Sequence, residues 1–342
     1  MAVHRLNLTR AQIIAYRRRV GALDERLPPG PDSLRQAAWA GLQDSMPRAA
    51  LLSIHARIEG TEPSVPEDPA LVQLWGPRFS VYVVAAADVA VFTLGRLPVE
   101  NARGLRVAEE MAARLAAFLD GRRMLMDEAA TGLDLHNANA MRYATTTGTV
   151  RIRWDGARQP TVWSVPRPKV DPREARVELA RRYLHLFGPG TPGGFAQWAG
   201  LGSPEGRAAF DALAGSLSAV GTPIGEGWIL GADETAFLAP AGPLALARLL
   251  PSGDAHYLLQ GADRDLLVPD ADRRAALWTS RVWPGAVLVA GEIVGTWRRA
   301  GPIVSIQSWR RLARQERDAV EAEAASLPLP GLQGRIALRW EE

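Results

Sequence analysis

Hydrophobic residues near the N-terminus recur with the spacing of amphipathic helices. The segment 6–23 has this pattern, and Thr9 stands where an N-cap is expected. A loop rich in proline and glycine follows, and Asp32 or Ser33 at its end is placed to cap a second helix that we expect to end near Gln43.

A third helix and a pair of strands are expected next. Pro47 suits the first turn of a helix, and Gly60 suits its C-terminal end. Residues 73–84 (QLWGPRFSVYVV) alternate well enough to form a strand or hairpin, broken at Gly76–Pro77. Two further helices are predicted, at 86–95 and 100–119.

The segment 122–165 predicts a winged helix, which is a helix–turn–helix followed by a β-hairpin called the wing. Two short helical patterns, RRMLMDEAATG and LDLHNANAMRYA, are joined by a glycine-containing turn. Apolar residues then alternate with Arg151 and Arg153, and Asp155–Gly156 is a hairpin-turn signal before the returning strand TVWSV. The expected wing therefore carries arginine.

The same order of elements recurs further along the chain. A helix at 177–188 precedes a second helix pair, in which Thr191 and Ser203 are the expected N-caps and a proline follows each. Residues 224–239 are expected to form the hairpin of this unit. The two units share an order of elements but no obvious sequence identity.

From about residue 240 the chain becomes loop-rich, with short apolar runs. A hairpin is predicted to turn at Ala290–Gly291, with 302–309 pairing beside it. A helix at 310–327 and an edge strand at 336–340 are expected to complete a mixed α/β domain.

These patterns predict an α+β protein made of tandem winged-helix units. Its expected parts are an N-terminal winged-helix unit at 1–120, a second unit at 121–170, a third at 171–240 and the C-terminal mixed α/β domain at 241–342.

Composition restricts the available chemistry. The 342 residues include no cysteine, which excludes disulfides, thiol catalysis, thiolate zinc sites and iron–sulfur clusters. Lys169 is the only lysine, so Schiff-base chemistry would have to use it or the N-terminal amine. The five histidines are scattered and no HExxH occurs. We therefore expect neither a metal nor another cofactor.

Familiar nucleotide and hydrolase motifs are missing or badly placed. GPGTPG at 188–193 has the letters of GxGxxG, but it follows a helix and two of its residues are prolines without an N–H. Neither GxxxxGK[ST] nor GxSxG occurs. No stretch approaches the roughly 18 apolar residues of a membrane span, and the N-terminus lacks the apolar core of a secretory signal. We therefore expect a cytoplasmic protein.

Positive charge is concentrated in two segments. The net charge is +5 between Arg142 and Lys169 and +7 between Arg273 and Arg317, whereas the whole chain carries only +3. Arginine suits bidentate contacts with phosphate and stacking on bases. The segments indicate a polyanion-binding face, with an arginine-biased composition as the alternative explanation.

Six blocks of the chain, in order, resemble the AlkZ/YcaQ group of winged-helix DNA glycosylases. They are AWAGLQDSMPRAALLSIHARIEG, QLWGPRFSVYVV, GTVRIRWDG, ARRYLHLFGPGTPGGFAQWAGL, GADRDLLVP and LVAGEIVGTWRR. The resemblance covers nearly the whole length. It implies three winged-helix units in a C-shaped arrangement around double-stranded DNA, and we expect the protein to act as a monomer.

The resemblance also implies a catalytic motif. The family centres catalysis on Gln-x-Gln or a variant of it, and the matching residues are Gln43, Asp44 and Ser45, with serine in place of the last glutamine. The implied activity is excision of cationic alkylated purines, N7-alkylguanine first, in base excision repair or in self-resistance to an alkylating natural product. Asp44 or Ser45 could instead simply cap the helix that starts near Pro47.

Six arginines are the expected DNA contacts, and each could alternatively be an ordinary solvated side chain. They are Arg78, Arg142, Arg151, Arg153, Arg298 and Arg299. Because Ser45 departs from the family pattern, a non-catalytic winged-helix regulator or damage sensor is the alternative function.

Overall fold

The computed structural model describes residues 6–156, 159–242, 244–331 and 335–341. The helices are α1 (Arg10–Val20), α2 (Pro31–Ala37), α3 (Ala49–His55), α4 (Val89–Thr93), α5 (Ala102–Leu119), α6 (Met126–Gly132), α7 (Pro172–Phe187), α8 (Pro192–Ala199), α9 (Ser203–Leu213), α10 (Glu234–Leu238), α11 (Asp263–Leu267), α12 (Ala271–Leu277) and α13 (Arg314–Ala325). Short 3₁₀ helices are η1 (Val65–Glu67), η2 (Pro77–Phe79), η3 (Ala86–Asp88), η4 (Leu94–Arg96), η5 (Ala138–Thr147), η6 (Ala214–Ser216), η7 (Gly231–Asp233) and η8 (Ala255–Tyr257).

The strands form three sheets. They are β1 (Leu6–Asn7), β2 (Leu42–Gln43), β3 (Leu71–Trp75), β4 (Val81–Ala85), β5 (Met124–Leu125), β6 (Val150–Arg153), β7 (Thr161–Ser164), β8 (Leu217–Thr222), β9 (Gly225–Leu230), β10 (Ala247–Leu250), β11 (Gly285–Val289), β12 (Glu292–Ala300), β13 (Ile303–Ser308) and β14 (Ala337–Glu341). Their orders are β1-β8-β9, β2-β4-β3-β6-β7-β5 and β10-β11-β12-β13-β14.

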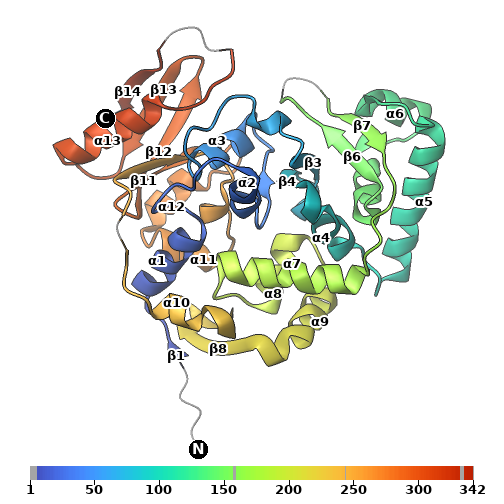
Figure 1. The fold of residues 1–342 in the computed structure, drawn as a ribbon, viewed down its shortest axis with the longest axis horizontal. Helices are drawn as coiled ribbons and strands as arrows, with labels where there is room; N and C mark the ends of the chain where they lie inside the picture. The colour runs from blue at the N-terminus through green and yellow to red at the C-terminus, as the bar shows by residue number, and fades with distance from the viewer. Residues whose placement is uncertain (1–5, 157–158, 243, 332–334, 342) are drawn as a thin grey trace, which may run out of the picture.

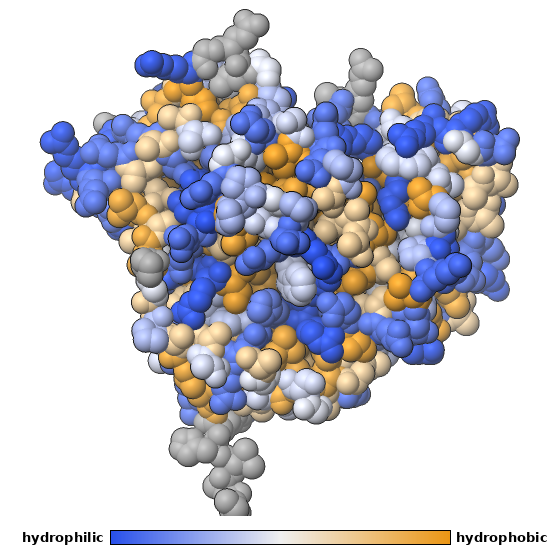
Figure 2. All heavy atoms as spheres, in the orientation of Figure 1, coloured by the Kyte–Doolittle hydropathy of each residue, from blue (hydrophilic) through white to orange (hydrophobic). Residues whose placement is uncertain are grey.

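The molecule is a mixed α+β fold in which the helices α1–α3 and α7 lie between two flanking parts (Figure 1). The β10–β14 sheet with α13 forms one flank, and α5, α6 and the β6–β7 hairpin form the other. On this face hydrophobic residues are scattered among hydrophilic ones (Figure 2). Among the described residues, none of the helices is long and apolar enough to cross a membrane.

The first helix forms as predicted, but the second does not. Thr9 caps α1, and its side chain accepts a hydrogen bond from the Gln12 N–H within a capping box. The expected caps of the second helix, Asp32 and Ser33, are wrong. Pro31 occupies the first helical position, so α2 begins there with Gly30 as its N-cap and already ends at Ala37.

The segment 122–165 has helical elements followed by a hairpin, in the predicted order, but its details differ from the prediction. A short strand, β5, precedes α6, and the second expected helix is the 3₁₀ helix η5. The wing strands pair from Val150↔Ser164 to Arg153↔Thr161, so the connection is wider than the expected Asp155–Gly156 turn. Part of this connection, 157–158, lies outside the described residues.

The third unit also differs from its prediction in two places. Thr191 caps α8 as expected, but Gly202 rather than Ser203 is the N-cap of α9. The predicted hairpin at 224–239 is wrong, because β9 pairs with the preceding segment β8 and residues 234–238 form α10. Of the segment predicted as a hairpin, only the part that forms β9 belongs to the hairpin, whose first strand is β8.

The C-terminal elements form as expected. The β11–β12 hairpin turns through Ala290 and Gly291, both in the left-handed region at φ 47° and 82°. Strand β14 lies at the edge of the sheet, parallel to β13, and α13 packs against β10.

The sheets combine strands from different predicted units. The six-stranded sheet joins β2, β3 and β4 to the wing strands β6 and β7, and β1 pairs in parallel with β8. The predicted unit boundaries therefore stay a prediction. What positions the candidate motif is the six-stranded sheet, in which β2 is the edge strand next to β4.

Candidate active site

Gln43 lies in strand β2 and not at the expected helix end, and Ser45 lies in the bend that follows the strand. Gln43 pairs with Tyr82 of β4, and the Asp44 N–H donates to the Val81 carbonyl at 2.7 Å. Gln43 and Ser45 are half-buried, while Asp44 between them is buried.

A glycine turn makes this local structure possible. Gly41 has φ +73°, and a Cβ there would come within 2.9 Å of the Tyr82 ring and 3.1 Å of the Phe92 ring. A side chain at this position would therefore be strained and would also clash with the core. The turn lets the chain leave α2 and enter β2.

The Gln43 side chain is held from two sides. Its Oε1 accepts a hydrogen bond from Nη2 of Arg78 at 3.1 Å. On another side lies Gly253, where an added Cβ would stand 3.3 Å from both Cδ and Nε2 of Gln43. The Gln43 amide is therefore oriented by the Arg78 guanidinium. It is also confined by the backbone of Gly253, where a residue larger than glycine would have little room.

Asp44 is engaged behind the strand. Only 7% of its surface is exposed; Oδ1 accepts from the Ala50 N–H at 3.0 Å and Oδ2 accepts from Nε2 of Gln73 at 2.7 Å. The first bond satisfies an N–H in the first turn of α3, although the N-cap residue of this helix is Arg48 and not Asp44 or Ser45. Burial raises the pKa of Asp44 to about 6, against the opposing effect of these hydrogen bonds.

Ser45 faces a polar cavity of about 650 Å³. Trp75, Trp154 and Arg142 also line it. Nη1 of Arg142 donates to the Phe79 carbonyl at 3.2 Å, and burial lowers the pKa of this guanidinium. Trp75 itself is fully buried.

Arg78 lies in an unusual turn between β3 and β4. Arg78 and Phe79 both have left-handed backbones, at φ 55° and 56°, a conformation that costs on the order of 1 kcal/mol for such residues. Nη1 of Arg78 also donates to the Trp198 carbonyl at 3.4 Å. The turn thus places one guanidinium between the end of α8 and Gln43.

The wing arginines differ in their exposure and in the protein groups that already bind their guanidinium groups. Arg151 donates to the carbonyls of Gly148 and Val150 beside it, and burial lowers its pKa to about 10. Arg153 is exposed, donates to the Pro66 carbonyl at 2.8 Å and lies 3.7 Å from the Glu67 carboxylate.

The two C-terminal arginines, Arg298 and Arg299, are neighbours on β12. Arg298 is exposed and donates to the Val282 carbonyl at 3.2 Å, while Arg299 donates to the Gly301 carbonyl at 2.8 Å. Burial lowers the pKa of Arg299, and the charge of Arg48 lowers it further. Arg299 is therefore close enough to Arg48, three residues after Ser45, for their charges to interact.

Sequence reasoning missed three supports of the motif. Gln73 holds Asp44, and its Oε1 accepts the Trp154 N–H at 2.7 Å; a glutamine within an apolar strand was the available signal. Gly253 gave no signal that linked it to Gln43. The third support is a buried ion pair between Arg57, which follows α3, and Asp254, at 2.7 Å. This pair connects the end of α3 to the loop that contains Gly253.

The described residues contain no group of three or more His, Asp or Glu side chains that could hold a metal ion. What the site offers is an oriented amide, a hydroxyl, a buried carboxylate and several arginines. This set can hold a water molecule and stabilise a developing cation beside a phosphate backbone.

Comparison with known proteins identifies the family. The model of the AlkZ-like DNA glycosylase family matches residues 37–328. The solved structure of the Streptomyces sahachiroi DNA glycosylase AlkZ is similar with a TM-score of 0.78 and 19% identity, over 98% of this chain and 100% of that one. No curated protein matches the chain by sequence.

The family match includes the candidate motif and most of the chain, and the likeness to AlkZ extends the shared fold to nearly all of it. The resemblance inferred from the six sequence blocks is therefore confirmed: the chain belongs to the AlkZ-like DNA glycosylase family and is an enzyme of DNA repair.

Proposed function

We propose that this protein is a monofunctional glycosylase that hydrolyses the N-glycosidic bond of cationic alkylated purines in double-stranded DNA. N7-alkylguanine is the principal substrate, and bulky natural-product adducts or crosslinks at N7 belong to the same class. The observation that carries the proposal is the Gln43 amide, which is held by Arg78 and by the backbone of Gly253.

The chemistry asks little of the leaving group. Alkylation at N7 makes guanine cationic, so breakage of the C1′–N9 bond returns the electron pair to a base that leaves neutral. The sugar becomes an oxocarbenium-like cation, and a water oxygen then bonds to C1′ and loses a proton to solvent. The protein must therefore orient this water and stabilise the cation.

Gln43 and Ser45 are suited to orient the water. Because Arg78 occupies one lone pair of the Gln43 Oε1, the second lone pair remains for a proton of the water. The Ser45 hydroxyl, two residues further along the chain, can bond the same water as donor or acceptor. Serine has a shorter side chain than the family glutamine and reaches less far toward the water, which lowers the rate without removing the mechanism.

Asp44 acts through its charge. Both of its oxygens bond to the protein, so it stabilises the sugar cation from behind the strand rather than by contacting the water. Its surroundings are buried, where Coulomb interactions are less screened than in water.

DNA is held by phosphate contacts from separate units of the fold. We assign these to the wing arginines Arg151 and Arg153, to Arg78 and Arg142 beside the motif, and to Arg298 and Arg299 on β12. Tandem winged-helix units in a C-shape, with the protein acting as a cytoplasmic monomer, complete the proposal.

A substrate panel tests it. The wild-type protein is incubated with duplexes that contain one 7-methylguanine, one bulky N7-guanine adduct, or no damage, and abasic sites are then cleaved with alkali. Strand cleavage of the damaged duplexes alone supports the proposal.

The variant Ser45→Gln separates the proposal from its alternative. Comparable damage-specific cleavage by wild type and variant supports an active enzyme. Cleavage by the variant alone, with wild type only binding the duplex, would assign wild type to a damage sensor or regulator that lost catalysis at position 45.

A further inference from the structure

The wing is joined to the sheet of the motif where β3 meets β6. The two strands pair at Gln73↔Ile152. If this antiparallel ladder continued, Trp154 would lie opposite Leu71. The Leu71 N–H instead donates to the Asp68 carbonyl at 2.9 Å, so the ladder does not extend to Trp154.

The side-chain amide of Gln73 takes the place of that ladder partner. Its Oε1 accepts the Trp154 N–H at 2.7 Å, and its Nε2 donates to the Trp154 carbonyl at 3.2 Å. Nε2 also donates to Oδ2 of Asp44 at 2.7 Å. Because a primary amide has two N–H donors and one acceptor oxygen, these three partners use both donors and fix the orientation of the amide.

Burial makes this arrangement costly to break. Gln73 and Asp44 are each 7% exposed, so neither can readily exchange its hydrogen bonds for bonds to water. A shift of Trp154 relative to Asp44 would leave a buried polar group without a partner. One side chain therefore holds the base of the wing and the Asp44 carboxylate in a fixed relation.

A second contact brings the wing connection against the segment that follows the motif. Gly156 has φ +84°, and a Cβ there would stand 2.7 Å from the Pro47 side chain. Pro47 follows Ser45 by two residues, and Ser45 and Gly156 line the same polar cavity of about 650 Å³. The start of the wing connection thus meets the surroundings of the motif at Pro47 as well as through Gln73.

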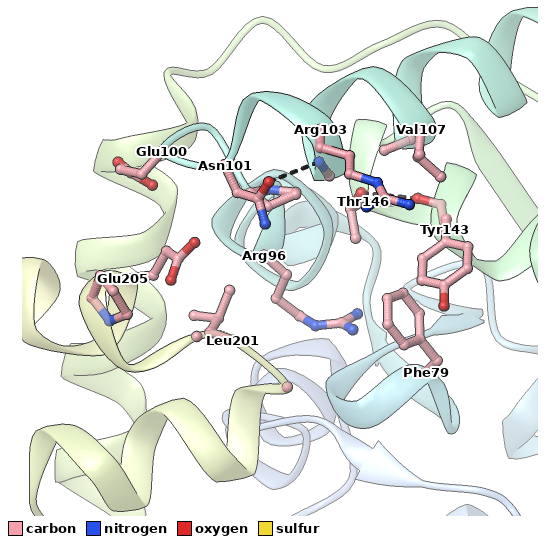
Figure 3. A pocket seen from close by; sticks show the side chains of 16 residues that line it. Phe79, Arg96, Glu100, Asn101, Arg103, Val107, Tyr143, Thr146, Leu201 and Glu205 are labelled. Atoms are coloured by element: carbon pink, nitrogen blue, oxygen red, sulfur yellow. Dashed lines mark hydrogen bonds between the residues drawn. The ribbon is translucent and has the colours of Figure 1, made fainter.

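The strand that carries Gln73 is also fixed at its C-terminal end. Arg96 is 2% exposed, and its Nη1 donates to the carbonyl of Trp75, the last residue of β3, at 3.1 Å. Its guanidinium lies 4.8 Å from the centroid of the Phe79 ring, and Figure 3 shows Arg96 directed toward Phe79. The end of β3 is therefore held by contacts that do not involve the wing.

We propose that Gln73 is a positioning residue that joins the wing to Asp44, so that seating of the wing on DNA fixes the Asp44 carboxylate behind the target sugar. The exposed Arg153, next to Trp154, supplies the DNA side of this link by contacting phosphate. Gln73 is buried and acts through Asp44 rather than on the substrate. The inference rests on the function proposed above and adds the residue through which DNA binding at the wing reaches the motif.

The charge of Asp44 offers one readout of the link. Burial raises the pKa of its carboxyl, and several groups oppose this effect: the backbone N–H of Ala50, the Gln73 amide, the Arg153 charge and the backbone N–H of Ala49. Because Gln73 donates to the ionised carboxylate, loss of its amide raises the pKa of Asp44 further. The negative charge that stabilises the sugar cation would then appear only at higher pH.

Single-turnover excision from a 7-methylguanine duplex, measured against pH, tests the proposal. Gln73→Met keeps the length of the side chain and removes its hydrogen bonds. We expect the midpoint of the profile to move from about 6 to higher pH by about one unit or more, as for loss of a hydrogen bond to a charged group. Above about pH 8 the rate should stay about tenfold below wild type, because Asp44 is charged but no longer held in place. An unchanged midpoint or an unchanged plateau would overturn the proposal.

Val162→Ala is the control for a loosened wing. Val162 lies on β7 opposite Ile152 and is fully buried, but it forms none of the bonds of Gln73. We expect this variant to lower the melting temperature, as removal of buried methyl groups does, and to keep the midpoint and plateau of wild type. Equal changes of the profile in Val162→Ala and Gln73→Met would assign Gln73 to general support of the fold and overturn the proposal.

A double mutant tests the DNA side of the link. At the alkaline plateau, where Asp44 is ionised, Arg153→Gln should slow single-turnover excision in the wild-type background. It should add no further loss to Gln73→Met, because the connection from wing to carboxylate is already broken there. Multiplying effects of the two substitutions would show that the wing acts independently of Gln73.

The Trp154 amide gives a readout that needs no catalysis. Its hydrogen exchange is followed by NMR in protein that contains nitrogen-15-labelled tryptophan, with Trp154→Phe to assign the signal and the Trp297 amide of β12 as internal reference. We expect exchange at Trp154 to be at least about tenfold faster in Gln73→Met than in wild type, with Trp297 unchanged. Equal exchange at Trp154 would overturn the link. If wild type protects this amide but excises nothing, the function proposed above fails while the link between wing and motif stands.

Discussion

Nη2 of Arg78 donates a hydrogen bond to Oε1 of Gln43 at 3.1 Å, across 35 positions of sequence. The bond fixes which end of the Gln43 amide is oxygen and turns Nε2 toward Gly253. Gln43, which must orient the water, is thus itself oriented by the Arg78 guanidinium. The strained backbone of Arg78 places this guanidinium beside Gln43.

Replacement of Arg78 should therefore slow base excision. Arg78→Ala frees the Gln43 amide to rotate, and we expect the single-turnover rate on a 7-methylguanine duplex to fall at least about tenfold, the effect of losing one hydrogen bond to a charged group. Arg78→Lys retains the charge but not the planar fork and should recover little. Arg181→Ala, which removes an exposed arginine on α7, is the control; an equal loss there would show a general charge effect.

Gly253→Ala should slow the reaction by displacing Gln43. The added methyl would stand 3.3 Å from Cδ and Nε2 of Gln43, at φ +77°. Gly121→Ala is the matched control, because Gly121 has φ +75° with nothing within 4 Å of an added Cβ. We expect similar losses of melting temperature in both variants but a slower single-turnover rate only in Gly253→Ala.

A double mutant shows whether Gly253 acts through Gln43. If it does, Gly253→Ala adds no further loss of rate in a Gln43→Ala background. Independent, multiplying effects would contradict a positioning role for Gly253.

The pH dependence should follow Asp44. Because burial raises the pKa of this carboxyl to about 6, its charge is present above that pH and is lost as pH falls through it. The single-turnover rate should therefore rise with pH between about 5 and about 7 in wild type. Asp44→Asn should be slower and lack this rise; parallel profiles for the two proteins would exclude Asp44 as the titrating group.

The salt dependence of DNA binding should change most when an exposed arginine is replaced, and less when the arginine already bonds to carbonyls of the protein. Each phosphate contact contributes about 0.9 to the slope of log affinity against log salt concentration. Arg298→Ala should lower the slope by about this amount, since Arg298 is exposed. Arg151→Ala should change the slope less, because the Arg151 guanidinium already bonds to the carbonyls of Gly148 and Val150. Equal slopes for Arg298→Ala and wild type would remove Arg298 from the interface.

The elements that sequence predicted well are those with local physical signals. Thr9 with Gln12 specifies a helix start, and Ala290–Gly291 specifies a hairpin turn, because both depend on residues adjacent in the chain. The family assignment depended on blocks spread along the whole chain, which made it robust to errors in any one element.

The local structure around the motif was harder to predict because tertiary contacts decide it. Gln43 was expected at a helix end, but pairing with Tyr82 draws it into β2. Asp44 is fixed by Gln73 and Gly253 confines Gln43, contacts that no spacing in the sequence reveals. The motif was therefore identified by resemblance, and its support only by the fold.

The central claim is that Gln43 orients the attacking water, and one comparison tests it most directly. Wild type, Gln43→Ala and the exposed-residue control Gln36→Ala are each incubated in excess over a duplex with one 7-methylguanine, followed by alkaline cleavage and gel analysis. We predict that Gln43→Ala binds the duplex normally but excises about a hundredfold more slowly, as when one preorganised polar group is lost from an active site. Excision by Gln43→Ala at the rate of wild type and Gln36→Ala would contradict the mechanism.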